Sequence, residues 1–91
     1  MADMFKFVGV SRHPNGEMKV RFANDASRVK VLARNGHTDI RFIEMEQPEH
    51  KMDCVDALLD WAEANTDTID GEILAAIADE AEAVGFDIAR F

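Results

Sequence analysis

The first half of the chain alternates apolar and polar residues with the period of two that a β-strand imposes. Residues 4–10 and 17–23 both show this alternation, and His13-Pro14-Asn15-Gly16 between them is typical of a tight turn. These segments predict a β-hairpin. A further alternating run over residues 39–46 predicts a third strand.

The alternation also predicts which apolar residues share a face of the sheet. One set is expected to face inward: Phe5, Phe7, Met18, Val20, Phe22, Ile40 and Phe42. The other face would mix apolar with basic side chains: Val8, Val10, Ile43 and Met45 with Lys6, Lys19, Arg21 and Arg41. We expect either the C-terminal helices or another molecule to cover this second face.

Three segments carry the spacing of amphipathic helices. A helix of about ten residues is expected after Asn24-Asp25, either of which can cap it, with Gly36 at its end. Gln47-Pro48 interrupts the third strand's pattern, and a second helix is expected over residues 50–64. Asp70 is expected to cap a last helix that ends near Gly85.

The resulting order, β-β-α-β-α-α, predicts an α+β fold with a small, mainly antiparallel three-stranded sheet, one inserted helix and two C-terminal helices. A length of 91 residues is that of a single domain, 1–91. The chain has no apolar run long enough for a membrane span, and its first residues do not resemble a signal peptide. Because Cys54 is the only cysteine, we expect no internal disulfide and a cytoplasmic protein.

The charge is unevenly divided along the sequence. Residues 1–48 have a net charge of +2, whereas residues 49–91 have a net charge of −10. Such a division permits two roles for charge beyond solubility. The basic half can bind nucleic acid directly, or the acidic helices can mimic the phosphates of DNA.

Few residues have the spacing that catalysis or metal binding requires. His50 and Cys54 are four apart on a predicted helix and can supply two metal ligands, but a zinc site needs three or four. His37 and Asp39 can be read as an acid–base pair, and Cys54 as a nucleophile, yet no orienting third group is evident. No glycine-rich phosphate loop is present. We therefore predict no catalytic, metal or cofactor site.

One stretch resembles a known group of proteins. It comprises Val20-Arg21-Phe22-Ala23-Asn24-Asp25, Arg28-Val29-Lys30-Val31-Leu32 and Gly36-His37-Thr38-Asp39-Ile40. This stretch is similar to small uncharacterised accessory proteins of marine cyanobacterial phages, over roughly residues 4–60. The resemblance implies a protein made in the cytoplasm of an infected bacterium. It brings no functional residues to any position of this chain.

Together these observations predict a small non-catalytic protein-interaction module that forms a homodimer. The contact residues expected from the pattern are Lys19, Arg21 and Arg41 on the sheet, with Trp61 and Phe91 as apolar anchors. The alternative is a nucleic-acid-related function, through the basic half or through acidic mimicry.

Overall fold

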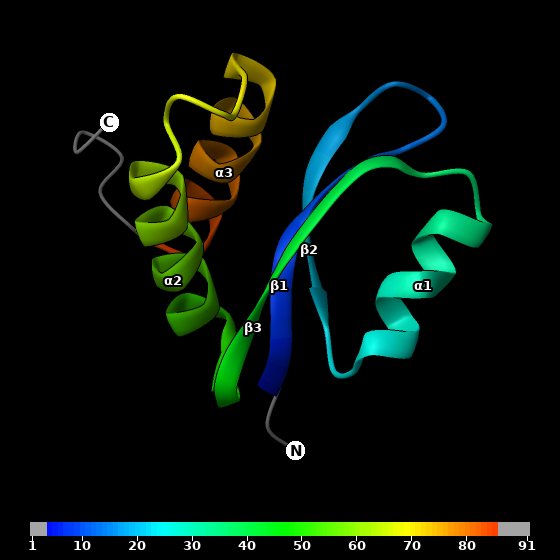
Figure 1. Cartoon of the computed structure of the whole chain (residues 1–91). Coiled ribbons are helices and arrows are strands. Elements are labelled where there is room, and N and C mark those ends of the chain that lie inside the picture. The colour runs from blue at the N-terminus through cyan, green and yellow to red at the C-terminus, as the bar shows by residue number, and fades with distance from the viewer. Residues whose placement is uncertain (1–3, 86–91) are drawn as a thin grey trace.

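A three-stranded antiparallel sheet separates one helix from the other two (Figure 1). This is a computed structural model, and it describes residues 4–85. The elements in chain order are β1 (Met4–Arg12), β2 (Met18–Ala23), α1 (Ala26–Arg34), β3 (Thr38–His50), α2 (Lys51–Ala64) and α3 (Gly71–Ala83). The fold is α+β with the element order that the sequence pattern predicts.

The sheet has β1 at its centre, in the order β2-β1-β3. Both neighbours are antiparallel to β1, and the β1–β2 pairing forms the predicted hairpin. The β1–β3 register shifts twice, between Phe5 and Phe7 and between Val10 and Arg12. The prediction that Gln47-Pro48 ends the strand pattern was wrong, because β3 continues to His50. An edge strand tolerates proline, which has no N–H to donate.

The main core lies between the sheet and α2 with α3. Val8 and Val10 are fully buried there, and they pack with apolar residues of both helices. The prediction that Val8 and Val10 lie on the face opposite Met18, Val20 and Phe22 was wrong. The register aligns Val8 with Phe22 and Val10 with Val20, and antiparallel partners point to the same face. We expected either the C-terminal helices or another molecule to cover this face. The C-terminal helices cover it, and they pack on Val8, Val10, Ile43 and Met45.

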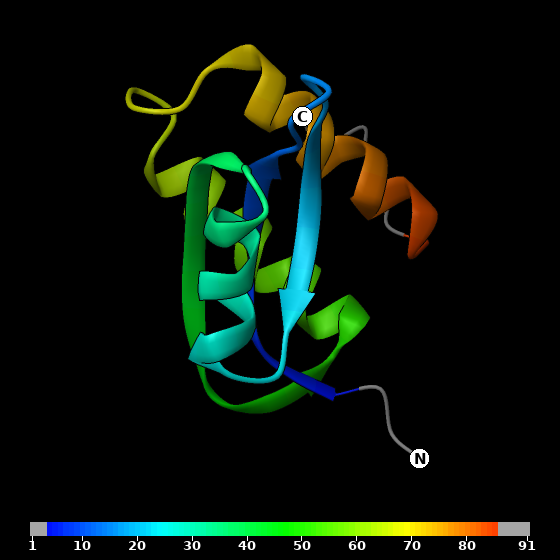
Figure 2. The same ribbon diagram turned by 90° about the vertical axis from the view of Figure 1, so that its right-hand side faces the viewer.

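The opposite face of the sheet lies beneath α1 (Figure 2). Asp25 caps this helix as predicted, because its side chain accepts a hydrogen bond from the backbone N–H of Arg28. All nine residues of α1 belong to the described part of the chain, and none of them is buried. Unlike α2 and α3, this helix therefore adds no fully buried residue to the core.

The two C-terminal helices begin and end close to their predicted bounds. Asp70 caps α3 by accepting a hydrogen bond from the backbone N–H of Ile73. Gly85 follows α3 with a φ of 99°, a conformation that glycine adopts readily at a helix end. Within residues 4–85, no helix combines the length and the apolar character that crossing a bilayer requires.

Candidate interaction surface

The uneven charge of the sequence becomes a division of charge between the two sides of the sheet. On one side, α1 carries Arg28, Lys30 and Arg34 and no acidic residue. On the other side, each C-terminal helix carries four carboxylates: Asp53, Asp56, Asp60 and Glu63 on α2, and Glu72, Asp79, Glu80 and Glu82 on α3. The molecule therefore presents a cationic helix and an anionic helix pair in opposite directions.

β2 is an edge strand that lies between these two layers. In the described part of the chain, β1 is its only strand partner. The edge strand is six residues long, without proline, glycine or a register shift. A regular edge of this kind presents unpaired backbone groups to a further strand.

A shallow hollow separates β2 from α1. The apolar residues Leu32 and Phe42 line it, together with Arg21 and Arg28. Val31 also lines this hollow, and it is one of few large apolar residues of the described chain that is strongly exposed, at 41%. This hollow thus offers apolar contact area next to positive charge.

Two neighbouring hollows lie between β2 and α3. Met18 and Ala76 line both of them. Their charged residues are mostly acidic: Asp79 lines both, Glu72 lines one and Glu80 the other, with Lys19 of β2 as the basic residue. The two sides of the β2 edge therefore have opposite charge.

The structure does not bring the predicted contact residues into one patch. Lys19 and Arg21 lie on the β2 edge, whereas Arg41 is exposed on β3 at the other edge of the sheet. Trp61 belongs to α2, where it is half-buried and packs against the core. Phe91 lies outside the described residues. Of the five residues, Lys19 and Arg21 remain close to one another at a single surface.

A polar cluster beneath α1 was not anticipated from the sequence. Ser11 is fully buried, and its Oγ accepts a hydrogen bond from Arg21 Nε at 3.2 Å. The same Oγ lies 3.0 Å from His37 Nδ1. Since the hydroxyl already accepts from Arg21, we assign its proton to the bond with Nδ1, which leaves the His37 proton on Nε2. The ring of His13 meets the ring of His37 edge-on at 5.1 Å.

This cluster lacks the arrangement of a serine–histidine catalytic site. Asp39, the predicted acid–base partner of His37, instead accepts a hydrogen bond from Arg12 Nε at 2.8 Å. The pKa of His37 is lowered by burial and by the charges of Arg21 and His13. Ser11 has no exposed surface for a substrate to reach. We interpret the cluster as a structural contact that fixes Arg21 at the side of the α1 hollow.

Cys54 and His50 do not form a common metal or catalytic site, because one is buried and the other is exposed. Cys54 is fully buried, and its Sγ lies within hydrogen-bonding distance of the backbone oxygens of Phe5 and Glu49. Burial, with nearby Glu49 and Asp53, raises the pKa of the thiol to about 11. His50 is exposed at the start of α2. Between residues 4 and 85, no three His, Cys, Asp or Glu side chains come together as metal ligands would.

Comparison of the chain with protein-family models, with curated proteins and with solved structures found no match.

Proposed function

We propose that the chain is a non-catalytic protein-interaction module that binds its partner at the side formed by β2 and α1. The observation that carries this proposal is the edge strand β2, with an apolar, cationic hollow on the side of α1. Exposed apolar area bordered by charge is typical of protein-binding surfaces.

The two edges of the sheet differ in a way that favours β2. The β3 edge has two register shifts, contains Pro48 and carries Glu44, Glu46 and Glu49. Irregular backbone, proline and charge are the features by which proteins protect a sheet edge from further strands. The β2 edge has basic residues at Lys19 and Arg21 but neither proline nor irregularity. A partner is thus more easily accommodated at β2.

Site-specific photo-crosslinking tests which side binds. A photoreactive residue at Val31, on α1, is compared with one at Met52, on α2; these two apolar side chains are 41% and 50% exposed. The experiment is done in bacterial cytoplasm, the setting implied by the phage-protein resemblance, with nuclease added before analysis. We expect a discrete protein adduct from position 31 and none from position 52. Equal labelling at both positions, or no adduct at 31, would contradict the proposal.

We also propose a homodimer, formed away from the β2 edge, because the sequence combines a large supply of apolar residues with divided charge. Light scattering at tens of micromolar is expected to give twice the mass of the chain. A monomer in light scattering would contradict the dimer without affecting the binding of a different protein.

A second candidate function is direct nucleic-acid binding through α1. It is favoured by three exposed cations, Arg28, Lys30 and Arg34, on a helix without acidic residues. Fluorescence anisotropy with labelled single and double strands at low salt tests this candidate. Binding should fall steeply as salt rises, since phosphate contacts release counterions. Lys30→Glu should weaken it, and a flat titration would exclude it.

Acidic mimicry of DNA is the other form of a nucleic-acid-related function. The exposed carboxylates of α2, such as Asp53, Asp56 and Asp60, supply negative charge for it. Mimicry predicts adducts from Met52 rather than from Val31, and with a host protein that itself binds DNA or RNA. The crosslinking experiment therefore separates mimicry from the leading proposal.

A further inference from the structure

We infer that the β2 edge receives an extended segment of a partner protein as a fourth strand, with acidic and basic side chains at alternate positions of that segment. This inference rests on the proposed function, because it assigns a binding mode to the same side of the molecule. It follows from the position of β2 between two helices of opposite charge.

The backbone of β2 provides the first part of the argument. β2 pairs with β1 over six successive residue pairs, from Phe7↔Ala23 to Arg12↔Met18, without a register shift. Its other edge meets no strand in the part of the chain that the structure describes. An extended peptide can continue the ladder there through main-chain hydrogen bonds.

The hollows on the two sides of β2 provide the specificity. Successive side chains of an added strand point alternately to the two faces of the sheet. On one face they would enter the hollow beside α1, and on the other they would meet the hollows beside α3. The chemistry of each hollow therefore selects every second residue of the partner segment.

On the α1 side, the available groups are cationic and apolar. Arg21 and Arg28 take part in none of the ion pairs found among the described residues, so their charges remain for a partner. Val31, Leu32 and Phe42 line the same hollow. The partner residues on this face should be acidic and aliphatic.

On the α3 side, the available groups are mostly anionic. Asp79 lines both hollows there and Glu80 lines one of them. Neither carboxylate belongs to an ion pair within residues 4–85. The partner residues on this face should therefore be basic.

A second copy of this chain does not meet these requirements at β2. Two antiparallel β2 strands related by a twofold axis would keep equivalent faces of the sheet on the same side. The two α1 helices would then be neighbours, as would the two α3 helices. Arg28 would approach Arg28 and Asp79 would approach Asp79, which is unfavourable. A different protein with the alternating charges is the occupant that fits.

A synthetic peptide tests the inference on the full chain. The probe is a labelled, capped peptide of about eight residues with Glu and Val in alternation at odd positions and Lys and Thr at even positions. The matched control has the same composition with Glu and Lys distributed over both faces. Anisotropy should show saturable binding of the first peptide and binding of the control that is roughly tenfold weaker. Equal binding of the two would overturn the inference.

Charge-reversal variants test the two sides separately. Arg28→Glu and Asp79→Lys should each weaken binding roughly tenfold. Arg34→Glu and Glu82→Lys are the matched controls on the same helices, and neither residue lines the hollows. Replacing Glu by Lys in the peptide should restore binding to the Arg28→Glu variant, which an unfolded variant would not show. Equal effects of the test and control substitutions would contradict the assigned hollows.

N-methylated peptides test separately whether the peptide forms main-chain hydrogen bonds with β2. N-methylation of alternate peptide bonds removes donors without changing side-chain charge. One of the two methylated series should lose binding and the other should retain it, because an added strand turns alternate N–H groups toward its neighbour. If both series bind equally, no fourth strand forms. A Val31 adduct together with non-binding peptides would reject the extended segment and leave the proposed function standing.

Discussion

At Gly9 the backbone of β3 leaves no room for a side chain on β1. A Cβ atom at Gly9 would lie 1.9 Å from the backbone oxygen of Arg41 and 2.6 Å from Cα of Phe42. We expect Gly9→Ala to lower the free energy of unfolding by about 3 kcal/mol, because the backbone itself must move. Urea unfolding measures this change. Gly71→Ala is the control: its Cβ meets nothing within 4 Å, so that variant should be neutral or slightly more stable.

His37 gives the stability of the fold a pH dependence. Its pKa lies below the ordinary histidine value of 6.5, first because of burial and then because of the charges of Arg21 and His13. The unfolded chain therefore takes up the proton at a higher pH than the folded chain does. Stability is present above pH 6.5 and declines as the pH falls through the range between the unfolded and folded pKa values.

Urea unfolding at a series of pH values, compared between the parent chain and His37→Asn, isolates this contribution. An asparagine oxygen can accept the Ser11 hydrogen bond but does not titrate. Below pH 6.5, the free energy of unfolding of the parent chain should fall relative to that of the variant. A constant difference over the series would show that His37 has an ordinary pKa.

The residues of β1 explain why its faces were assigned wrongly from the sequence. Phe7 and Val8 are adjacent, so the alternation allows either Phe5 with Phe7 or Val8 with Val10 to face the core. In the structure Val8 and Val10 are buried under α2 and α3, and Phe5 also packs against this core, beyond a register shift that separates it from Phe7. A single sequence does not reveal that register shift.

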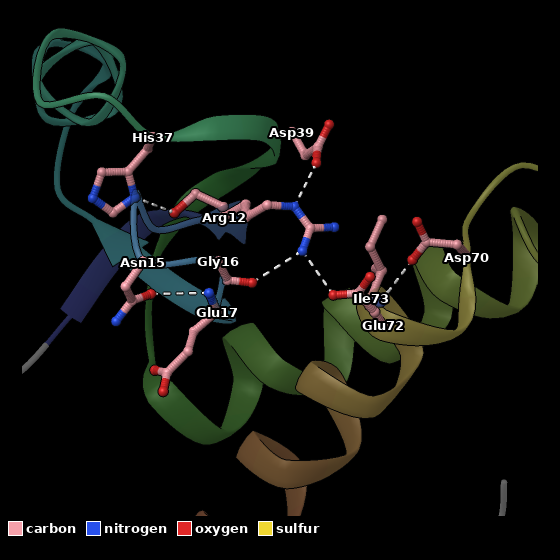
Figure 3. Close-up of polar contacts among 10 residues, drawn as sticks. Arg12, Asn15, Gly16, Glu17, His37, Asp39, Asp70, Glu72 and Ile73 are labelled. Carbon is pink, nitrogen blue, oxygen red and sulfur yellow. Dashed lines mark hydrogen bonds and ion pairs between the residues drawn. The ribbon is translucent and has the colours of Figure 1, made fainter.

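At the scale of elements, Arg12 connects three segments that are distant in the chain. Its Nη1 donates to the backbone oxygen of Gly16 at 3.1 Å and to Glu72 at 2.7 Å, and its Nε donates to Asp39 (Figure 3). These contacts join the hairpin turn, the beginning of β3 and the first turn of α3. The pKa of Arg12 is raised, mainly by the bonds to Glu72 and Asp39.

We expect Arg12→Met to lower the urea midpoint and to loosen α3 from the hairpin. Lys6→Met is the control, since Lys6 forms one exposed ion pair, with Glu44. Amide hydrogen exchange should show faster exchange in α3 for Arg12→Met but not for Lys6→Met. Equal exchange in the two variants would mean that Arg12 adds nothing beyond an ordinary surface pair.

The elements themselves could be predicted from the sequence, whereas the candidate surface could be predicted only in part. Asp25 and Asp70 cap helices as their residue types indicate. The prediction that Lys19 and Arg21 share a sheet face with Val8 and Val10 was wrong, because their register partners are Ser11 and Gly9. Their part in binding stays a prediction. The contact of Ser11 with His37 joins residues 26 positions apart. It depends on the strand pairing and on the position of α1, which local patterns do not encode.

At the scale of the whole molecule, the sheet acts as a partition between charges. The first half of the sequence supplies the cations of α1, and the second half supplies the carboxylates of α2 and α3. β2 contacts both α1 and α3, so its edge offers both charges to a common partner. Arg41, chosen from the sequence, lies on β3 at the opposite edge, and Trp61 lies on α2, because chain order alone does not determine the strand order.

The central position of β1 also affects how the chain matures during synthesis. β1 is translated before either of its neighbours, but its second neighbour, β3, is complete only at His50, and the helices that cover it come later still. Val8 and Val10, fully buried in the finished fold, thus leave the ribosome early and are covered late. During that interval the nascent hairpin exposes apolar residues, the kind of surface that favours aggregation until it is covered.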